Sequence, residues 1–233
     1  MKKLASLSVF FPAYNEEGNI AQTVTKALKV LPKVAHKWEL IVVNDGSTDK
    51  TASNVKNLQV QEKRIRLISH RQNQGYGSAL KTGLYQAKYD WIAFTDSDGQ
   101  FDFSEIIKFL PLAGQADLVI GYRLDRQDSL LRKFFGWGWT LLSNLLLGIK
   151  VRDVDCAFKL LKKEVIKRID PLVSERGGMI SPELLAKARK KGYQIAQIGV
   201  HHYPRQEGHQ TGAGLKVILS SFVDLGKLWW QIK

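Results

Sequence analysis

The segment WIAFTDSDGQFD, residues 91–102, places three aspartates and a glutamine directly after a short apolar run. The run itself is typical of a buried β-strand, because it is rich in aromatic and β-branched residues and is followed by turn-forming residues. Asp96, Asp98 and Gln100 are spaced by two, so in an extended segment their side chains point to the same side. Two carboxylates and an amide oxygen form a hard-oxygen set suited to Mg²⁺ or Mn²⁺. The alternative, a helix N-cap, accounts for Asp102 only.

Four other short apolar runs have the character of strands, and segments with a helical pattern separate most of them. The strand-like runs are LSVFF (7–11), ELIVV (39–43), IRLIS (65–69) and DLVIG (117–121), in addition to WIAFT (91–95). The helical faces consist of Ile20, Val24, Ala27, Leu28 and Leu31, then Ala52, Val55 and Leu58, then Ala79, Leu80, Leu84 and Ala87. This alternation predicts an α/β fold, with a mostly parallel sheet that carries helices on both faces and binds ligands at the carboxyl ends of its strands.

Polar loops follow the first four of these strands and therefore lie along one edge of the predicted sheet. They read PAYNEEGN (12–19), NDGSTD (44–49), RQNQGYG (71–77) and DSDGQ (96–100). Any one of them could be a solvated rim, but together they indicate a crevice for a polar ligand. We expect Ser47 or Thr48 to cap the following helix, which leaves Asp45 free to accept a hydrogen bond from a nucleobase ring N–H.

The composition describes an ordinary globular chain with a strong excess of positive charge. Hydrophobic residues make up 44% and charged residues 24% of the 233, which favours one folded unit. Thirty-five Lys and Arg against 22 Asp and Glu give a net charge of +13, which favours anionic partners: nucleic acid, phosphorylated substrates or an acidic membrane surface. The single cysteine, Cys156, allows neither an internal disulfide nor a cysteine pair for a metal, and we expect it to be a buried apolar residue.

Two apolar segments have some features of a leader peptide or a membrane segment. The N-terminal MKKLASLSVFFPAYNEE lacks a convincing cleavage site and is better interpreted as a strand. The segment FFGWGWTLLSNLLLGI, 134–149, has no charged residue, but its 16 residues fall short of the roughly 20 that span a bilayer. We therefore expect no transmembrane helix.

The motifs PAYNEE, VVNDGSTDKT, NQGYGSALKTGL, DSDGQ, GYR and DVDCAFKLLKKEV follow one another in this order over nearly the whole chain. In order and spacing they resemble inverting family 2 glycosyltransferases, and more narrowly the dolichol-phosphate mannosyltransferase and polyprenyl-phosphate glycosyltransferase branch. The resemblance implies a GT-A-like nucleotide-diphosphosugar transferase fold with amphipathic interface helices. It implies a single domain, 1–233, with a nucleotide-sugar-binding half (1–121), an acceptor half (122–214) that holds an interfacial segment (132–149), and a C-terminal amphipathic segment (215–233).

The resemblance also implies roles for individual residues. The nucleotide-sugar pocket is expected to contain Pro12, Ala13, Tyr14, Glu16, Asp45 and Asp96, with Asp45 reading the base. Asp96, Asp98 and Gln100 are expected to hold Mg²⁺ or Mn²⁺ and, through it, the donor diphosphate. The catalytic residues are expected to be Asp98 with Arg123, Arg132 and Arg205, the three arginines holding the acceptor phosphate.

A phosphate acceptor simplifies the expected chemistry. A phosphate monoester has a second pKa near 6, so it is largely a dianion at neutral pH and needs no general base. The alternative, a soluble hydroxyl acceptor, needs a base, for which Glu183 or Asp153 is the candidate. A basic nucleic-acid-binding module is a second alternative, but it leaves the acidic cluster unexplained, so we expect no nucleic-acid partner.

A lipid acceptor has to be met at a bilayer surface, and two segments have the composition for it. The first contains Phe134, Phe135, Trp137, Trp139, Leu141 and Leu142, flanked by Arg132, Lys133 and Lys150. The second contains Trp229 and Trp230 beside Lys227 and Lys233. We expect a peripheral protein on the cytoplasmic side of the membrane, alone, as a homo-oligomer or with an anchoring subunit. Alternatively, both segments are core or dimer surface.

Overall fold

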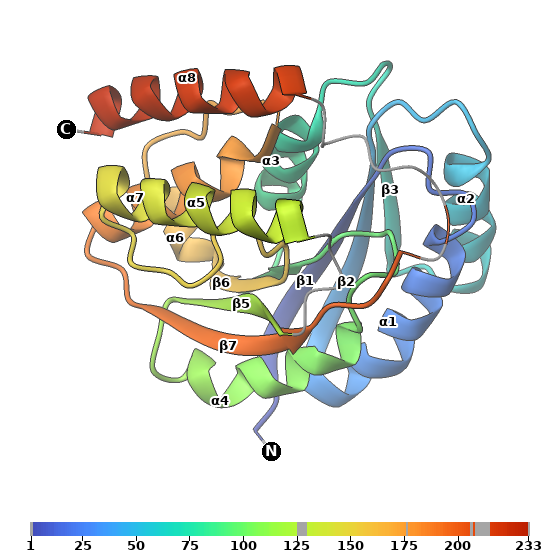
Figure 1. Ribbon diagram of the computed structural model, residues 1–233. Coiled ribbons are helices and arrows are strands. Elements are labelled where there is room, and N and C mark those ends of the chain that lie inside the picture. Colours follow the sequence, from blue (N-terminus) through green and yellow to red (C-terminus); the bar gives the residue numbers. More distant parts are fainter. Residues whose placement is uncertain (1, 125–129, 176, 206, 208–214, 233) are drawn as a thin grey trace.

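The computed structural model describes residues 2–124, 130–175, 177–205, 207 and 215–232, with the side chains of 130–132, 177, 215–220 and 232 excepted (Figure 1). Within this part of the chain the strands form one sheet in the order β3-β2-β1-β4-β6-β5-β7. Their bounds are β1 Leu4–Ala13, β2 Ala35–Asn44, β3 Ile65–Ser69, β4 Trp91–Phe94, β5 Leu118–Leu124, β6 Lys159–Lys162 and β7 Ile195–His201. Only β6 is antiparallel to its neighbours among these strands.

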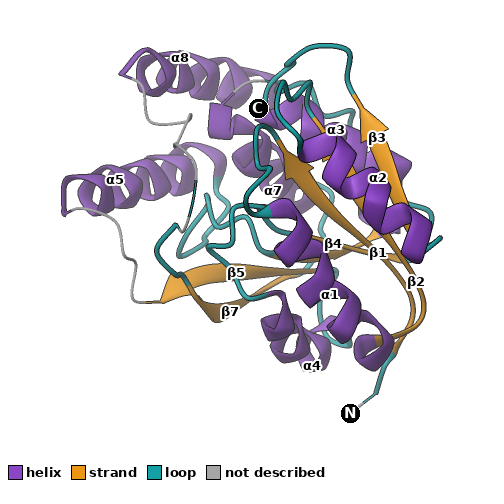
Figure 2. Ribbon diagram, turned by 90° about the vertical axis from the view of Figure 1, so that its right-hand side faces the viewer, coloured by secondary structure: helices purple, strands orange, loops and turns teal. Residues whose placement is uncertain are grey.

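Helices cover both faces of the sheet (Figure 2). One face carries α1 (Ile20–Val34), α2 (Thr51–Gln61), the 3₁₀ helix η1 (Phe103–Phe109) and α4 (Leu110–Ala113). The other carries α3 (Tyr76–Gln86), α6 (Lys163–Arg168) and α7 (Ile180–Lys190). The remaining elements, η2 (Gly177–Met179), α5 (Leu130–Leu147) and α8 (Leu215–Ile232), pack beyond α7. The mostly parallel α/β architecture predicted from the sequence is confirmed.

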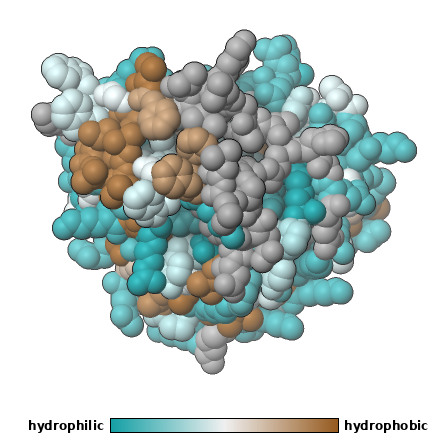
Figure 3. Space-filling model, viewed as in Figure 1, coloured by the Kyte–Doolittle hydropathy of each residue, from teal (hydrophilic) through white to brown (hydrophobic). Residues whose placement is uncertain are grey.

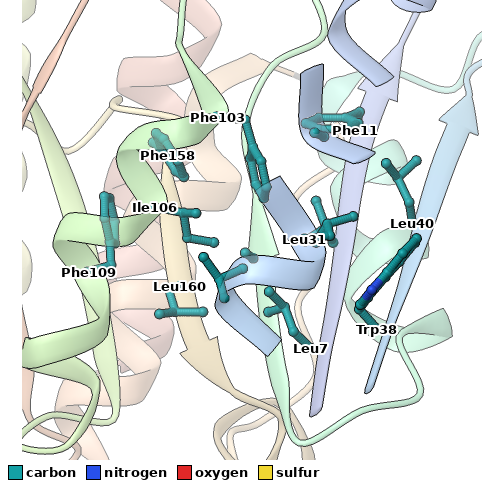
Figure 4. Close-up of a cluster of buried hydrophobic side chains, with 14 of the residues drawn as sticks. Leu7, Phe11, Leu31, Trp38, Leu40, Phe103, Ile106, Phe109, Phe158 and Leu160 are labelled. Carbon is teal, nitrogen blue, oxygen red and sulfur yellow. The ribbon is translucent and has the colours of Figure 1, made fainter. Parts of the chain in front are cut away.

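The alternation of side chains along β1 divides the core into two layers. Val9 and Phe11 point into the cluster under α1 and η1, which Figure 4 shows in close-up. Phe10 points the other way and stacks on Phe94 of β4, with 5.0 Å between ring centroids. All of these side chains are buried, and burial of such a residue is worth roughly 2 to 3 kcal/mol. The length and burial of this strand fit its place inside the sheet, between β2 and β4.

All five predicted strands are present, but two further strands, β7 and β6, were not among them, and β6 was the harder of the two to detect. It has only four residues, KLLK, and two of them are lysines, so neither alternation nor a long apolar run reveals it. Its place depends on pairing with both β4 and β5, which are distant in sequence. The reversal of direction at β6 separates the first part of the sheet from the pair β5 and β7.

The helices α5 and α8 lie side by side and form a separate layer (Figures 1 and 2). Leu225 and Leu228 of α8 pack with Met179 and with side chains of α5. The ring of Trp139 meets that of Phe222 edge-on, with 5.5 Å between centroids. Among the described helices, none combines the length and the apolar character that crossing a bilayer requires.

Candidate functional site

The loops after β1 and β2 hold each other in place at the carboxyl edge of the sheet. The backbone N–H of Asn15 donates to Ser47 Oγ at 2.9 Å, and that of Thr48 donates to Asn15 Oδ1 at 2.9 Å. The backbone N–H of Glu16 donates to Thr51 Oγ1 at 2.8 Å. The prediction that Ser47 or Thr48 caps the next helix is therefore wrong, because both connect the two loops, and helix α2 begins after Lys50 with no side-chain cap.

Asp45 lies at the end of β2 and is buried, and its carboxylate is already engaged. Its Oδ1 accepts from His70 Nδ1 at 2.6 Å and from the backbone N–H of Gln74 at 3.0 Å. Its Oδ2 accepts from the backbone N–H of Gly75 at 2.8 Å. The expectation that the Asp45 carboxylate has no protein partner is wrong, because His70, Gln74 and Gly75 in the loop after β3 donate hydrogen bonds to it. A carboxylate offers about four acceptor positions, so the described residues leave one of them unfilled, on Oδ2.

The metal motif turns sharply after β4, with Gly99 at a φ of 76°. Tyr76 donates its hydroxyl to Asp96 Oδ1 at 2.8 Å, and the backbone N–H of Gln100 donates to Asp98 Oδ1 at 3.0 Å. The side-chain amide of Gln100 donates to the carbonyl of Tyr203 at 3.1 Å, which leaves the amide oxygen as an acceptor. The N-cap alternative holds for Asp102. Its Oδ1 accepts a hydrogen bond from the backbone N–H of Ser104 and so caps η1.

The electrostatics of this motif suit a cation. Burial, and next the charge of Asp98, raise the pKa of Asp96 to about 7, although the Tyr76 hydrogen bond opposes the shift. Burial likewise raises the pKa of Asp98. The described residues contain no group of three His, Cys, Asp or Glu side chains placed to hold a metal. Two carboxylates and an amide oxygen still fit Mg²⁺ or Mn²⁺, because such an ion completes its coordination with water and substrate phosphates.

Arg205 supplies a positive charge to the same motif. Its Nη1 lies 3.4 Å from Asp98 Oδ2, and its Nη2 pairs with Glu16. Glu16 also accepts from Asn19 Nδ2 at 2.7 Å, while burial raises its pKa. Glu16 and Arg205, predicted for the nucleotide pocket and the acceptor phosphate respectively, therefore lie together beside Asp98.

Arg123, the other described arginine of the predicted set, pairs with Asp153 rather than with Asp98 or Glu16. Its Nε and Nη2 donate to Asp153 at 2.7 and 2.8 Å, a bidentate pair. Burial alone would lower the pKa of Arg123, but the hydrogen bonds from this pair raise it above the ordinary range. Arg132 is in α5, and its side chain is outside the described residues. The structure thus does not bring Arg123 and Arg205 into contact.

The remaining predicted pocket residues form the wall at the end of β1. The carbonyl of Pro12 accepts from Ser97 Oγ at 2.8 Å, and that of Ala13 from the backbone N–H of Asp45 at 2.9 Å. Tyr14 follows with a half-buried side chain. This wall joins the loops that carry Asp45 and the metal motif.

Three residues of this region were not singled out from the sequence: Tyr76, Asp155 and Lys159. Tyr76 donates to Asp96, as described above, and Asp155 lies in the loop before β6. Lys159 is fully buried and donates to Ser181 Oγ at 3.1 Å and to the carbonyl of Cys156. Burial lowers the pKa of Lys159. A lysine inside the apolar run CAFKLL was the available signal for a buried charge. Cys156 is buried as predicted, and burial raises its pKa to about 12.

The comparison with protein families agrees with the architecture and the motif order. The family model described as Glycosyl transferase family 2 matches residues 8–170. The chain belongs to glycosyltransferase family 2. The GT-A-like fold expected of that family is also found in solved structures: glucosyl-3-phosphoglycerate synthase from Mycobacterium tuberculosis, in complex with UDP, aligns with a TM-score of 0.71 at 19% identity, over 97% of this chain and 80% of that one.

Curated relatives of this family 2 glycosyltransferase domain include two that are 31% identical over 206 residues. One is a dolichyl-phosphate beta-glucosyltransferase from Trichomonas vaginalis, covering 81% of this chain and 61% of the relative. The other is a dodecaprenyl-phosphate galacturonate synthase from Rhizobium johnstonii, covering 87% of this chain and 60% of the relative. The chain thus spans about three fifths of the length of these relatives. Its family and branch agree with the resemblance seen in the sequence.

Proposed function

We propose that this chain transfers a single sugar from a nucleotide diphosphate sugar to a polyprenyl or dolichyl phosphate, with inversion and with the help of Mg²⁺ or Mn²⁺. The observation that carries the proposal is the pair of desolvated aspartates, Asp96 and Asp98, at the carboxyl end of β4. Relatives named for dolichyl-phosphate and dodecaprenyl-phosphate products support the acceptor class.

The donor base is a uracil in this proposal. Asp45 has one acceptor position left, and the ring N3–H of uracil needs one. Guanine presents two adjacent donors, N1–H and the 2-amino group, which would require two acceptor positions. A neighbour in fold is described in complex with uridine diphosphate and supports this assignment only as an analogy.

The donor diphosphate lies at Asp96, Asp98 and Gln100 in this proposal. The cation, when bound there, neutralises the charge that develops on the leaving diphosphate. Tyr76 holds Asp96 in orientation through its hydroxyl, and the backbone of Gln100 does the same for Asp98. Arg205, which contacts Asp98 and Glu16, lies next to this diphosphate site and is assigned to the acceptor phosphate.

The acceptor phosphate is held by arginines, and it attacks the anomeric carbon as a dianion. Arg123 keeps its charge because Asp153 stabilises it, and its remaining N–H groups can donate to phosphate oxygens. Arg132 and Arg205 are the further arginines proposed for this role. Attack in line with the departing diphosphate inverts the anomeric configuration, and no residue has to remove a proton.

The outer faces of α5 and α8 meet the membrane surface in this proposal. Phe134, Phe135, Trp137 and Leu145 of α5 are exposed, Trp137 by 62%, and so is Trp230 of α8, by 76%. Figure 3 shows hydrophobic side chains gathered on this side of the molecule. Lys133, Lys150 and Lys227 are exposed beside them and can reach anionic headgroups. Trp139 and Leu142, predicted for the same surface, instead face inward and pack beside the Leu225 and Leu228 cluster.

The soluble hydroxyl acceptor is a weaker candidate because both residues named as its base are occupied. Asp153 holds Arg123 in the bidentate pair. Glu183 is fully buried and accepts from the backbone N–H groups of Val173 and Ser174 at 2.8 Å and from Lys187. Burial opposes its ionisation, but these hydrogen bonds prevail and lower its pKa.

A product assay tests the proposal. The purified chain is incubated with UDP- and GDP-linked sugars and with undecaprenyl or dolichyl phosphate in detergent, with Mn²⁺ or with a chelator. We expect lipid-linked sugar from a UDP-linked donor only, and only with the cation. Product on a soluble sugar acceptor but not on the lipid phosphate would overturn the acceptor class, and product from GDP-linked donors would overturn the base assignment.

A further inference from the structure

His70 is the first residue after β3, as Asp45 is the first residue after β2. The backbone N–H of His70 donates to the carbonyl of Asn44 at 2.9 Å, so the pairing of the two strands continues to this position. The side chains of His70 and Asp45 therefore start from neighbouring points at the carboxyl edge of the sheet. The side chain of His70 is only 10% exposed, which distinguishes it from a solvated surface histidine.

Both ring nitrogens of His70 have a partner. Nδ1 lies 2.6 Å from Asp45 Oδ1, and Nε2 lies 2.9 Å from Thr82 Oγ1 on α3. An ionised carboxylate can only accept, so Nδ1 carries a proton and donates to Asp45. In the neutral ring, Nε2 is then an acceptor for the Thr82 hydroxyl. The ring is thus fixed between the end of β2 and helix α3.

The loop after β3 supplies the other donors to Asp45. The backbone N–H groups of Gln74 and Gly75 donate to Oδ1 at 3.0 Å and to Oδ2 at 2.8 Å respectively. This loop lies directly against the end of β2, since a Cβ on Gly46, where φ is 71°, would come within 2.4 Å of the backbone carbonyl carbon of Gln72. Among the donors that the described residues supply to this carboxylate, His70 is the side chain and the other two are backbone. His70 is therefore the donor that a substitution can remove.

The filled positions on the carboxylate decide which nucleobase Asp45 can recognise. His70 and Gln74 together fill both acceptor positions of Oδ1, whereas Gly75 fills one of the two on Oδ2. The ring N3–H of uracil is a single donor, which the unfilled position on Oδ2 can accept. Guanine presents N1–H and the 2-amino group side by side. With Oδ1 filled, its second donor finds no acceptor on this carboxylate, and a desolvated donor without a partner lowers affinity.

We propose that His70 positions Asp45 for uracil: by donating to Oδ1, it fixes the carboxylate and keeps that oxygen closed to a second nucleobase donor. This inference rests on the proposed function, because it takes Asp45 as the residue that reads the donor base. Thr82 contributes by holding the ring at its other nitrogen. The preference for uridine over guanosine nucleotides thus depends on a histidine that acts through Asp45 rather than on the nucleotide itself.

Calorimetry in the presence of Mn²⁺ tests the inference with three ligands: UDP, GDP and inorganic pyrophosphate. His70→Phe keeps a ring of similar shape but removes both nitrogens. We expect it to lower the affinity for UDP by about 10-fold, since a hydrogen bond to a charged group has roughly this value, and to leave the affinities for GDP and pyrophosphate within about twofold. His70→Asn places an amide N–H near the position of Nδ1 and should restore most of the UDP affinity. Thr82→Val, which loosens the ring, should give a smaller loss for UDP alone.

Pyrophosphate separates base recognition from a structural effect, because it occupies the diphosphate site without a base. Equal losses for all three ligands, an unchanged ratio of UDP to GDP affinity in His70→Phe, or no recovery in His70→Asn would overturn the inference. If His70→Phe does not fold, Thr82→Val decides, and an unchanged ratio in that variant overturns the inference. A wild type that does not prefer UDP to GDP overturns both the inference and the proposed base. The expected nucleotide preferences without transfer of sugar to lipid phosphate overturn the proposed function alone.

Discussion

The carboxyl edge of the sheet and the outer face of α5 and α8 differ in how many protein contacts their side chains make. At the edge, charged groups are desolvated and bound to protein partners, as Asp45 is by His70 and two backbone N–H groups. On the outer face, Phe134, Trp137 and Trp230 are exposed apolar groups. The edge is thus preorganised by contacts within the chain, whereas these exposed side chains would leave water only by binding something outside the chain, which is the membrane surface in the proposal above.

The largest expected effect concerns the edge. Asp98→Ala should reduce donor turnover by about 1000-fold or more, because the divalent cation contributes several kcal/mol to transition-state stabilisation. The fold should persist, as judged by circular dichroism and thermal melting. Asp102→Ala in the same loop removes only the cap of η1 and should keep turnover within a few-fold. Activity retained by Asp98→Ala with added Mn²⁺ would contradict the metal assignment.

The next effect concerns the outer face. Replacing Phe134 and Trp137 together by Ser should weaken sedimentation with anionic vesicles by roughly 30-fold, since each side chain loses part of the 1.5 to 3 kcal/mol that apolar burial provides. The melting temperature should change little, because both residues are exposed. Val60→Ser on α2, where Val60 is 73% exposed, is the matched control and should bind vesicles as the wild type does. Unchanged sedimentation of the double variant would mean that this face does not bind lipid.

A smaller effect is a difference in pH dependence: metal binding at the edge should depend on pH, whereas vesicle binding by the outer face should not. The pKa of Asp96 is raised to about 7, mainly by burial, so the carboxyl is increasingly protonated below pH 7 in the absence of metal. Because a cation binds the ionised form, the Kd for Mn²⁺ should rise toward the acid side, by up to about tenfold per pH unit well below that pKa. Mn²⁺ titrations from pH 8 to 5.5 measure this, with Asp96→Asn, which should show a weaker affinity and a flatter pH profile, as the comparison. Pelleting with neutral vesicles should vary far less over the same range.

The smallest effect on catalysis is expected at Glu183. Glu183→Gln should leave turnover of the folded protein within about twofold, because Glu183 holds Lys187 and the backbone at Val173 and Ser174 rather than a substrate. It should cost about 3 kcal/mol of unfolding free energy, since a buried partner of Lys187 loses its charge. Urea denaturation with parallel rate measurements checks both. A large loss of turnover with normal stability would revive the hydroxyl-acceptor alternative.

Much of the structure of residues 1–121 could be predicted because the signals there are local. The strands up to β5 are apolar runs bounded by turn residues, and each polar loop follows its strand directly in sequence. β6 escaped prediction because KLLK is short and its partners, β4 and β5, are distant in the chain. The helical character of 130–147 was visible, but the division of its aromatics into exposed Trp137 and inward Trp139 was not, since it depends on where α8 packs.

The sequence by itself determined the alternation of strands and helices, the order of the loops along one edge, and the acids and amide that suit a divalent cation. These follow from side-chain periodicity and residue chemistry over a few neighbouring positions. Only the tertiary structure decided that Asp45 has one acceptor position left, that Arg205 pairs with Asp98 and Glu16, and that Trp139 reaches Asp155. Each of these depends on side chains 16 to 189 positions apart meeting in a desolvated place, and no local pattern encodes which donor fills which acceptor.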